Sequence, residues 1–378
     1  MKQCTILFID TGLRLEPKIY QVKPIGGSEL SLLLLAEGLC ELGHRTIILQ
    51  PNQHYYYDSQ QQLTIDDLHK LAEYIPIVDF VVLNRTHIDL SLIPATLPVF
   101  YFSHDAYDQQ ILNWLSFSNV ISRLTKIICV SEWQAYTFRI YRNIPAEKLT
   151  VVPNACFKVE WCWGHERSQK NNILTYASIP FKGLHMLPDL FFDICMSTKR
   201  DDLELWIFSS YKLYDREDDS KTHAVLSQLR RMKGVRLFPL LPPSELINMF
   251  KKAHVYVHPQ TYHETFGMVI AQAMATGVIP VSTSKGALPE FISHNENGLL
   301  TTGPNIEEYS TWVEFVDLVA IALEPSSYRL SLKAQQIVAE KFDYIKVANQ
   351  FLTTIGGYIY DQHPTSKDNL STRIRIRL

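Results

Sequence analysis

The segment HETFGMVIAQAMATGVIPV carries the residues whose types and spacing could best hold a ligand. Its apolar residues recur every three or four positions, which predicts a helix with one buried face, and Gly277 ends that helix before the next strand. The first N–H groups of a helix lack internal partners and lie at the positive end of its dipole. Glu264 could accept hydrogen bonds from two vicinal sugar hydroxyls there, and Gly267 would let a phosphate or sugar approach the backbone. The alternative is that Glu264 only caps the helix.

Three further positions combine a reactive or permissive residue with the end of a predicted element. Gly26-Gly27 precede a leucine-rich helix and could bring backbone N–H groups to a phosphate, or form a plain turn. His104 follows the apolar run LPVFYF and could exchange a proton near neutral pH, or be a core histidine bonded to a carbonyl group. Lys182, beside Gly183, could pair with a diphosphate, whereas the alternative is a solvated surface lysine.

The elements that must position these residues alternate between strand and helix along the whole chain. In the first half we expect strands at 5–9, 45–49, 79–83, 97–102, 126–130 and 149–152, with helices at 29–42, capped by Ser28, and at 106–124. In the second half we expect strands at 173–177, 203–208, 235–238, 253–258 and 278–282, with helices at 184–197, up to 232, 244–251 and 342–360. Such alternation predicts doubly wound parallel sheets, which bind ligands at the carboxyl ends of their strands.

A break in periodicity at 156–172 indicates a domain boundary. We therefore predict a first domain at 1–160, a second at 161–341, a final helix at 342–360 and a polar tail at 361–378. A chain of 378 residues is long enough for two domains of ordinary size.

Composition narrows the classes of function. Hydrophobic residues make up 46% and charged residues 20% of the chain, as in soluble globular proteins. No apolar run is long enough to span a bilayer, and the start MKQCTILFID lacks a cleavage-site pattern, so we expect at most peripheral membrane contact. The net charge of −3 gives no argument for nucleic-acid binding. Six cysteines without a CxxC pair favour small core residues over a zinc site or disulfides, and a reducing, cytoplasmic setting.

Several blocks of the chain together resemble the family 4 glycosyltransferases, which have the GT-B fold. The blocks are GGSELSLLLLAEGLCELGH, ICVSEW, VVPNA, YASIPFKGL, HETFGMVIAQAMATGVIPV, GALPEFI and ENGLL. The resemblance covers about residues 4 to 355. It implies an α/β architecture of two Rossmann-like domains that face each other across a cleft. The first domain would then hold the acceptor, the second would bind the nucleotide-sugar, and the final helix would cross back to the first domain.

The resemblance also assigns roles to individual residues. It implies catalytic roles for His104, Lys182 and Glu264, with His104 near the hydroxymethyl group of the sugar. The residues expected to bind the nucleotide-sugar are Gly26, Gly27, Ser178, Lys182, Glu264, Thr265, Phe266, Gly267, Met268 and Gln272. This chain departs from the family pattern at three places. Gln272 replaces a second glutamate, Ser178 an arginine, and Ser209-Ser210 a glycine-rich turn.

The function that we expect is transfer of a sugar from a nucleotide-sugar to a hydroxyl acceptor such as a glycan, a lipid-linked glycan or a small molecule. The resemblance implies retention of anomeric configuration. No Asp-x-Asp pair occurs in a donor-site context, so we expect no essential metal and no cofactor. Two alternatives stay open, a non-catalytic binding protein of the same fold and a sugar-nucleotide epimerase. The sequence does not distinguish UDP-, GDP- and ADP-sugars, and it leaves the oligomeric state open.

Overall fold

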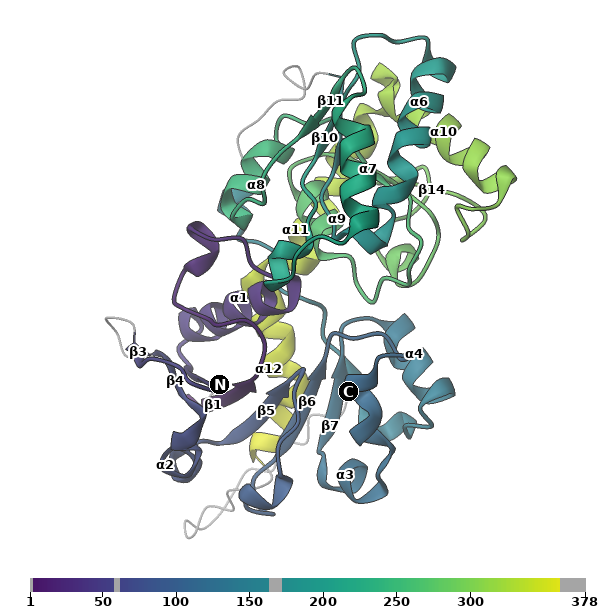
Figure 1. The fold of residues 1–378 in the computed structure, drawn as a ribbon. Helices are drawn as coiled ribbons and strands as arrows, with labels where there is room; N and C mark the ends of the chain where they lie inside the picture. The colour runs from purple at the N-terminus through teal and green to yellow at the C-terminus, as the bar shows by residue number, and fades with distance from the viewer. Residues whose placement is uncertain (1–2, 58–61, 163–171, 361–378) are drawn as a thin grey trace.

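The computed structural model describes residues 3–57, 62–162 and 172–360. It consists of two α/β domains, one above the other in Figure 1. The predicted tail at 361–378 and most of the predicted boundary segment lie outside the described residues.

The first domain is built on one sheet with the strand order β3-β4-β2-β1-β5-β6-β7-β8, in which only β3 runs antiparallel to its neighbour. Its strands are β1 (Thr5–Asp10), β2 (Arg45–Gln50), β3 (Tyr56–Tyr57), β4 (Leu63–Asp67), β5 (Phe80–Asn84), β6 (Val99–Ser103), β7 (Lys126–Cys129) and β8 (Leu149–Val151). Every residue of the neighbouring strands β5 and β6 is buried, as expected for parallel strands covered on both faces. The chain winds from β1 to either side, so β1 and β5 form the switch point of the sheet.

The helices of the first domain differ from the expectation at several places, and those at 71–74 and 132–141 fall outside the predicted helix ranges. They are α1 (Gly27–Glu41), α2 (Leu71–Tyr74), α3 (Ser118–Arg123) and α4 (Glu132–Tyr141). The single helix predicted at 106–124 is wrong, because a 3₁₀ helix at Gln110–Ser116 precedes α3. Leu112 and Leu115 are both buried there, and their three-residue spacing fits one 3₁₀ turn. Ser28 does not cap α1, since its hydroxyl donates to the Glu29 carboxylate instead.

The second domain has a parallel sheet with the order β11-β10-β9-β12-β13-β14. Its strands are β9 (Ile173–Tyr176), β10 (Glu204–Ile207), β11 (Val235–Leu237), β12 (Val255–His258), β13 (Ile279–Ser282) and β14 (Leu299–Leu300). The remaining helices are α5 (Val159–Cys162), α6 (Leu187–Thr198), α7 (Ser220–Arg230), α8 (Pro243–Phe250), α9 (Met268–Ala275), α10 (Tyr309–Leu323), α11 (Tyr328–Phe342) and α12 (Tyr344–Tyr360). The switch point of this sheet lies between β9 and β12.

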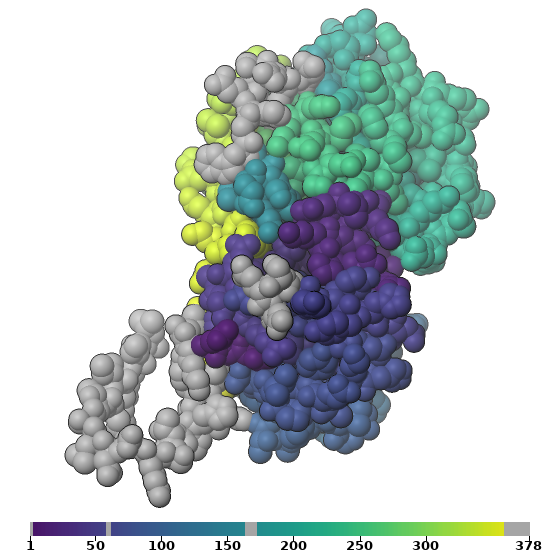
Figure 2. Space-filling model, turned by 90° about the vertical axis from the view of Figure 1, so that its left-hand side faces the viewer, coloured from purple at the N-terminus to yellow at the C-terminus, as the bar shows by residue number. Residues whose placement is uncertain are grey.

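Helix α12 joins the two domains. It leaves the second domain after α11 and runs along α1 of the first domain, as the yellow helix in Figure 1 shows. The contact is close because Gly38 has no side chain: a Cβ atom there would lie 2.8 Å from the carbonyl oxygen of Tyr344. On the face seen in Figure 2, the purple N-terminal segment meets the green second domain, in agreement with the packing of the turn Ile19–Gln21 on α8. Among the described helices, none is both long and apolar enough to cross a bilayer.

Candidate active site

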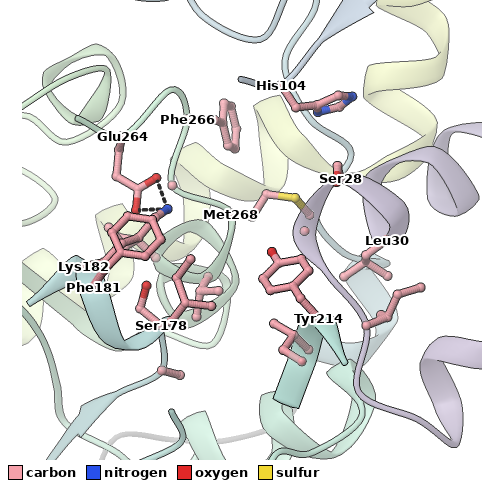
Figure 3. Close-up of a pocket in the computed structure, with 18 of the residues that line it drawn as sticks. Ser28, Leu30, His104, Ser178, Phe181, Lys182, Tyr214, Glu264, Phe266 and Met268 are labelled. Carbon is pink, nitrogen blue, oxygen red and sulfur yellow. Dashed lines mark hydrogen bonds and ion pairs between the residues drawn. The ribbon is translucent and has the colours of Figure 1, made fainter. Parts of the chain in front are cut away.

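A cavity of about 630 Å³ lies between the two domains. The strand ends of both sheets contribute to its wall, and Figure 3 shows part of the lining. All of the residues that the sequence singled out as site residues line this cavity, except Gly26, which lies next to it. The fold therefore brings together positions up to 245 residues apart in the sequence, from Gly27 to Gln272.

An ion pair between Lys182 and Glu264 forms one wall of the cavity (Figure 3). Lys182 Nζ lies 2.7 and 2.8 Å from the two carboxylate oxygens of Glu264. The Glu264 side chain is 8% exposed, and the Lys182 side chain 22%. Burial alone would raise the pKa of Glu264, but the Lys182 charge and the contact with His258 at 3.5 Å outweigh it and lower the pKa to about 2. Glu264 is therefore an ionised acceptor throughout the physiological pH range.

Backbone contacts fix Glu264 at the mouth of α9. The Ala287 N–H donates to the Glu264 carbonyl oxygen at 2.8 Å. A Cβ atom at Gly286 would lie 2.3 Å from that oxygen, so only glycine fits beside it. The N-cap residue of α9 is Gly267, which has a φ of 100°. No side-chain hydrogen bond caps the helix at this residue. The capping role considered for Glu264 is therefore wrong, and no side chain in the described part of the chain accepts from the first N–H groups of α9.

His104 is held in one tautomer by a chain of buried groups. Asn84 Nδ2 donates to the Asp10 carboxylate at 2.9 Å, which turns Asn84 Oδ1 toward His104 Nε2 at 3.0 Å. Because Oδ1 can only accept, Nε2 carries the proton and donates. Burial, followed by the nearby Arg85 charge, lowers the pKa of His104 to about 3, so the ring is neutral. The His104 carbonyl group also accepts from the Thr265 hydroxyl at 2.9 Å, a direct bond between the domains.

Gln272 and Ser178, two of the departures from the family pattern, both have defined partners. Gln272 Nε2 donates to the Cys156 carbonyl group at 2.9 Å, and the residue is only 3% exposed. Its carbonyl oxygen makes no hydrogen bond with the described part of the chain. The Ser178 carbonyl group accepts from the Ser209 hydroxyl at 2.5 Å, which ties the third departure, the serine turn after β10, to the end of β9.

Among the cavity-lining residues that sequence reasoning did not assign to the site are Arg85, Asp105 and Tyr214. Arg85 has a φ of 52°, and its Nε lies 2.9 Å from both carboxylate oxygens of Asp105. Both residues follow the carboxyl ends of strands, so the rule that found His104 could have found them. Tyr214 lies in a charged loop without a motif, and nothing in the sequence indicated it.

Further contacts join the two domains beside the cavity. The Glu290 carboxylate accepts from the N–H groups of Glu132, at 2.9 Å, and Trp133, at 2.5 Å, where α4 begins. The Trp133 ring stacks on His263 with a centroid distance of 5.3 Å. These contacts join the domains directly beside the cavity, an arrangement that we call closed. Within the described residues, no group of three or more His, Cys, Asp or Glu side chains is arranged to hold a metal ion.

Comparison with known proteins relates part of this chain to a protein family. Residues 163–316 match the family model of glycosyl transferases group 1. The D-inositol 3-phosphate glycosyltransferase of Corynebacterium efficiens is 29% identical over 119 residues, which are 31% of this chain and 26% of that protein. The enzyme of the same name from Corynebacterium diphtheriae is 36% identical over 69 residues, 18% of this chain and 16% of that protein. The match spans about a quarter or less of these two curated relatives.

Solved structures resemble the chain over nearly its whole length. Anabaena Alr3699/HepE in complex with UDP and glucose has a TM-score of 0.69 at 20% identity, covering 94% of this chain and 100% of that one. Sucrose-phosphate synthase from Thermosynechococcus elongatus has a TM-score of 0.70 at 14% identity, covering 95% and 100%. At such identities the likeness concerns the fold. Residues 163–316 therefore carry a glycosyl transferases group 1 domain, within a chain that has the GT-B fold.

Proposed function

We propose that this protein transfers a sugar from a nucleotide-sugar to a hydroxyl group of an acceptor, with retention of anomeric configuration. The observation that carries the proposal is the buried Glu264–Lys182 pair beside the open N-terminus of α9, in a cavity between two domains. The group 1 match and the UDP complex of the Anabaena structure support a nucleotide-sugar as the donor.

The proposed roles follow from charge and position. When the bond between sugar and diphosphate breaks, negative charge grows on the leaving diphosphate. Lys182 and the N–H groups at the start of α9 would stabilise that charge without reorganising. Glu264, ionised and fixed by its backbone, would accept hydrogen bonds from two sugar hydroxyls. The His104 ring would lie on the acceptor side of the cavity and would be uncharged there.

Gln272 and the turn at Gly26-Gly27 complete the proposed donor site. The free carbonyl oxygen of Gln272 would accept a hydrogen bond from a ribose hydroxyl, more weakly than a carboxylate would. The backbone at Gly26 and Gly27 would face the diphosphate from the first domain. Lys182 and the α9 N-terminus would supply a positive field at the diphosphate, so we propose activity without a metal. We also propose a reducing, cytoplasmic setting in which the six cysteines stay free.

The test is release of a nucleoside diphosphate. Purified protein is incubated with UDP-, GDP- and ADP-glucose, with and without excess EDTA, and free UDP, GDP and ADP are measured. The expected result is release from one of the three donors in both conditions, with Glu264→Gln as the inactive control. If no donor releases nucleotide and none raises the melting temperature, the non-catalytic alternative replaces the proposal. Conversion of the donor to an epimer would instead identify an epimerase.

A further inference from the structure

The loop after β10 carries a short 3₁₀ helix, Tyr211–Tyr214, at the place where the family resemblance leads us to expect a glycine-rich turn. The Ser210 hydroxyl accepts from the N–H group of Lys212 at 3.1 Å and donates to the Asp218 carboxylate at 2.9 Å. The same carboxylate accepts from the Tyr211 N–H group at 2.7 Å. These bonds fix the loop on both sides of its helix, so Tyr214 is presented in a defined position.

From this position Tyr214 reaches across the cleft to the first domain. Its Cε1 atom lies only 3.0 Å from where a Cβ atom of Gly26 would be, so the ring is in van der Waals contact with the glycine turn. Figure 3 shows the ring between the Glu264–Lys182 pair and Ser28, with its hydroxyl turned away from the loop that carries it. Tyr214 therefore lies between the two groups, Lys182 and the Gly26-Gly27 turn, that would contact a diphosphate from opposite sides.

The Tyr214 hydroxyl is a hydrogen-bond donor without an acceptor in the described part of the chain. It makes no hydrogen bond with any residue that the structure describes, although the residue is half-buried. Burial, followed by the nearby Glu29 carboxylate, raises the pKa of Tyr214 to about 12, so the hydroxyl keeps its proton at neutral pH. The hydroxyl is not one of the fully buried unpaired polar atoms, so solvent reaches it, and an oxygen of an anionic ligand could accept from it in place of water.

The surrounding charges explain why a neutral donor would be useful here. Lys182 is already paired with Glu264, and Arg85 with Asp105. Ser178 stands where the family pattern has an arginine. The Tyr214 hydroxyl therefore adds an uncharged donor to a cavity that the exposed Arg216 and the first residues of α9 also line. We propose, on the basis of the proposed function, that the Tyr214 hydroxyl donates a hydrogen bond to the diphosphate of the nucleotide-sugar. Tyr214 would then be one of the residues of this chain that bind the nucleotide-sugar.

The experiment compares binding of a nucleoside diphosphate with binding of the matching nucleoside. Calorimetry with UDP, GDP and ADP identifies the best ligand of the wild type, and that ligand is then titrated into Tyr214→Phe, Tyr214→Ala and Tyr309→Phe. Tyr309 is 84% exposed on α10, so Tyr309→Phe is the matched control that removes a phenol hydroxyl outside the site. A hydrogen bond to a charged group predicts that Tyr214→Phe weakens diphosphate binding by about tenfold to a hundredfold. Binding of the nucleoside, which has no phosphate, should stay within about twofold of the wild type.

The outcomes separate this inference from the proposed function. If the wild type binds one of the diphosphates but Tyr214→Phe binds it equally well, the Tyr214 role is overturned while the proposed function stands. Tighter binding by Tyr214→Ala would likewise overturn it, because the ring would then be a plug that competes with the ligand. If the wild type binds none of the three diphosphates, the proposed function itself fails, and the Tyr214 role with it.

Discussion

Lys182 Nζ contacts both carboxylate oxygens of Glu264, at 2.7 and 2.8 Å, across 82 positions of sequence. The Lys182 charge keeps the Glu264 carboxylate ionised in a site that is largely closed to water. A diphosphate group would interact with the Lys182 charge. Sugar hydroxyls would donate hydrogen bonds to the Glu264 carboxylate. The same contact thus holds the site in its ligand-free form and prepares it for both ends of the donor.

Loss of Lys182 should reduce turnover. We expect Lys182→Ala to lower kcat by about ten- to a thousandfold, corresponding to roughly 1.4 to 4 kcal/mol of lost charge stabilisation on the leaving group. Steady-state kinetics with the donor found above measure this effect, and Lys221→Ala, at an exposed position of α7, is the control. Kinetics equal to those of the wild type would show that Lys182 only neutralises Glu264.

The Glu264 carboxylate should make stability depend on acid pH. Its pKa is about 2 in the folded protein against 4.5 for an ordinary glutamate. The folded state binds a proton less readily than the unfolded state, so the contribution is complete above pH 4.5 and is lost as the pH falls through about 2. It amounts to about 3 kcal/mol at most. Urea unfolding at pH 7, 5, 4 and 3 should show the advantage of wild type over Glu264→Gln shrinking toward low pH, while the exposed Glu296→Gln shows no such trend.

Gln272 should resist replacement by the glutamate that the family pattern has at this position. Its amide nitrogen donates to the Cys156 carbonyl group, and a carboxylate there would place two acceptors against each other in a buried site. We expect Gln272→Glu to lower the free energy of unfolding by about 1 to 3 kcal/mol, and by more than Gln272→Met, which removes the donor without adding a charge. Urea unfolding ranks the three proteins. Equal stability of wild type and Gln272→Glu would show that the Cys156 contact contributes nothing.

How far the sequence predicts this molecule depends on which interactions are local. Strand positions such as 45–49 and 126–130 could be predicted because buried parallel strands are continuous apolar runs. Residues at strand ends, His104 and Lys182 among them, could be placed at one edge of a sheet by the same rule, and they do line one cavity. The helix at 106–124 could not be predicted correctly, since the competition between α and 3₁₀ turns there is decided by packing against the sheet.

The pairing between residues could not be predicted from the sequence. The Lys182–Glu264 contact depends on where a turn after β9 and a loop after β12 meet in space. Tyr214 was missed for the same reason, because its role in the wall comes from a contact with Gly26 in the other domain. The tautomer of His104 depends on Asp10 and Asn84, which lie in two different strands and show no shared motif.

The Glu290 carboxylate should favour the closed arrangement of the domains. It accepts from the first two N–H groups of α4, as a helix cap does, but from the opposite domain. Loss of a cap costs about 1 kcal/mol, so Glu290→Ala should shift the balance between open and closed forms about fivefold toward the open one. Small-angle X-ray scattering should show a larger radius of gyration, and Trp133 fluorescence a loss of the stacking on His263. Glu296→Ala is the control, and an unchanged scattering profile for Glu290→Ala would contradict the prediction.

His104 should stay neutral across the pH range in which histidines normally titrate. Its pKa is about 3 in the folded protein against 6.5 for an ordinary histidine, because the ring is buried and close to Arg85. The unfolded chain takes up a proton below pH 6.5 that the folded chain does not, so this group makes stability fall as the pH drops from 6.5 toward 3. NMR of protein labelled at histidine nitrogen, with His104→Gln to assign the signal, should show a proton on Nε2 and no titration of His104 between pH 8 and 5. Asn84→Asp places a carboxylate against Nε2 and should raise the pKa of His104 by about one unit or more. Titration of the wild-type ring near pH 6.5 would show that burial and Arg85 do not keep it neutral, and a proton on Nδ1 instead of Nε2 would show that the Asp10–Asn84 chain does not fix the tautomer.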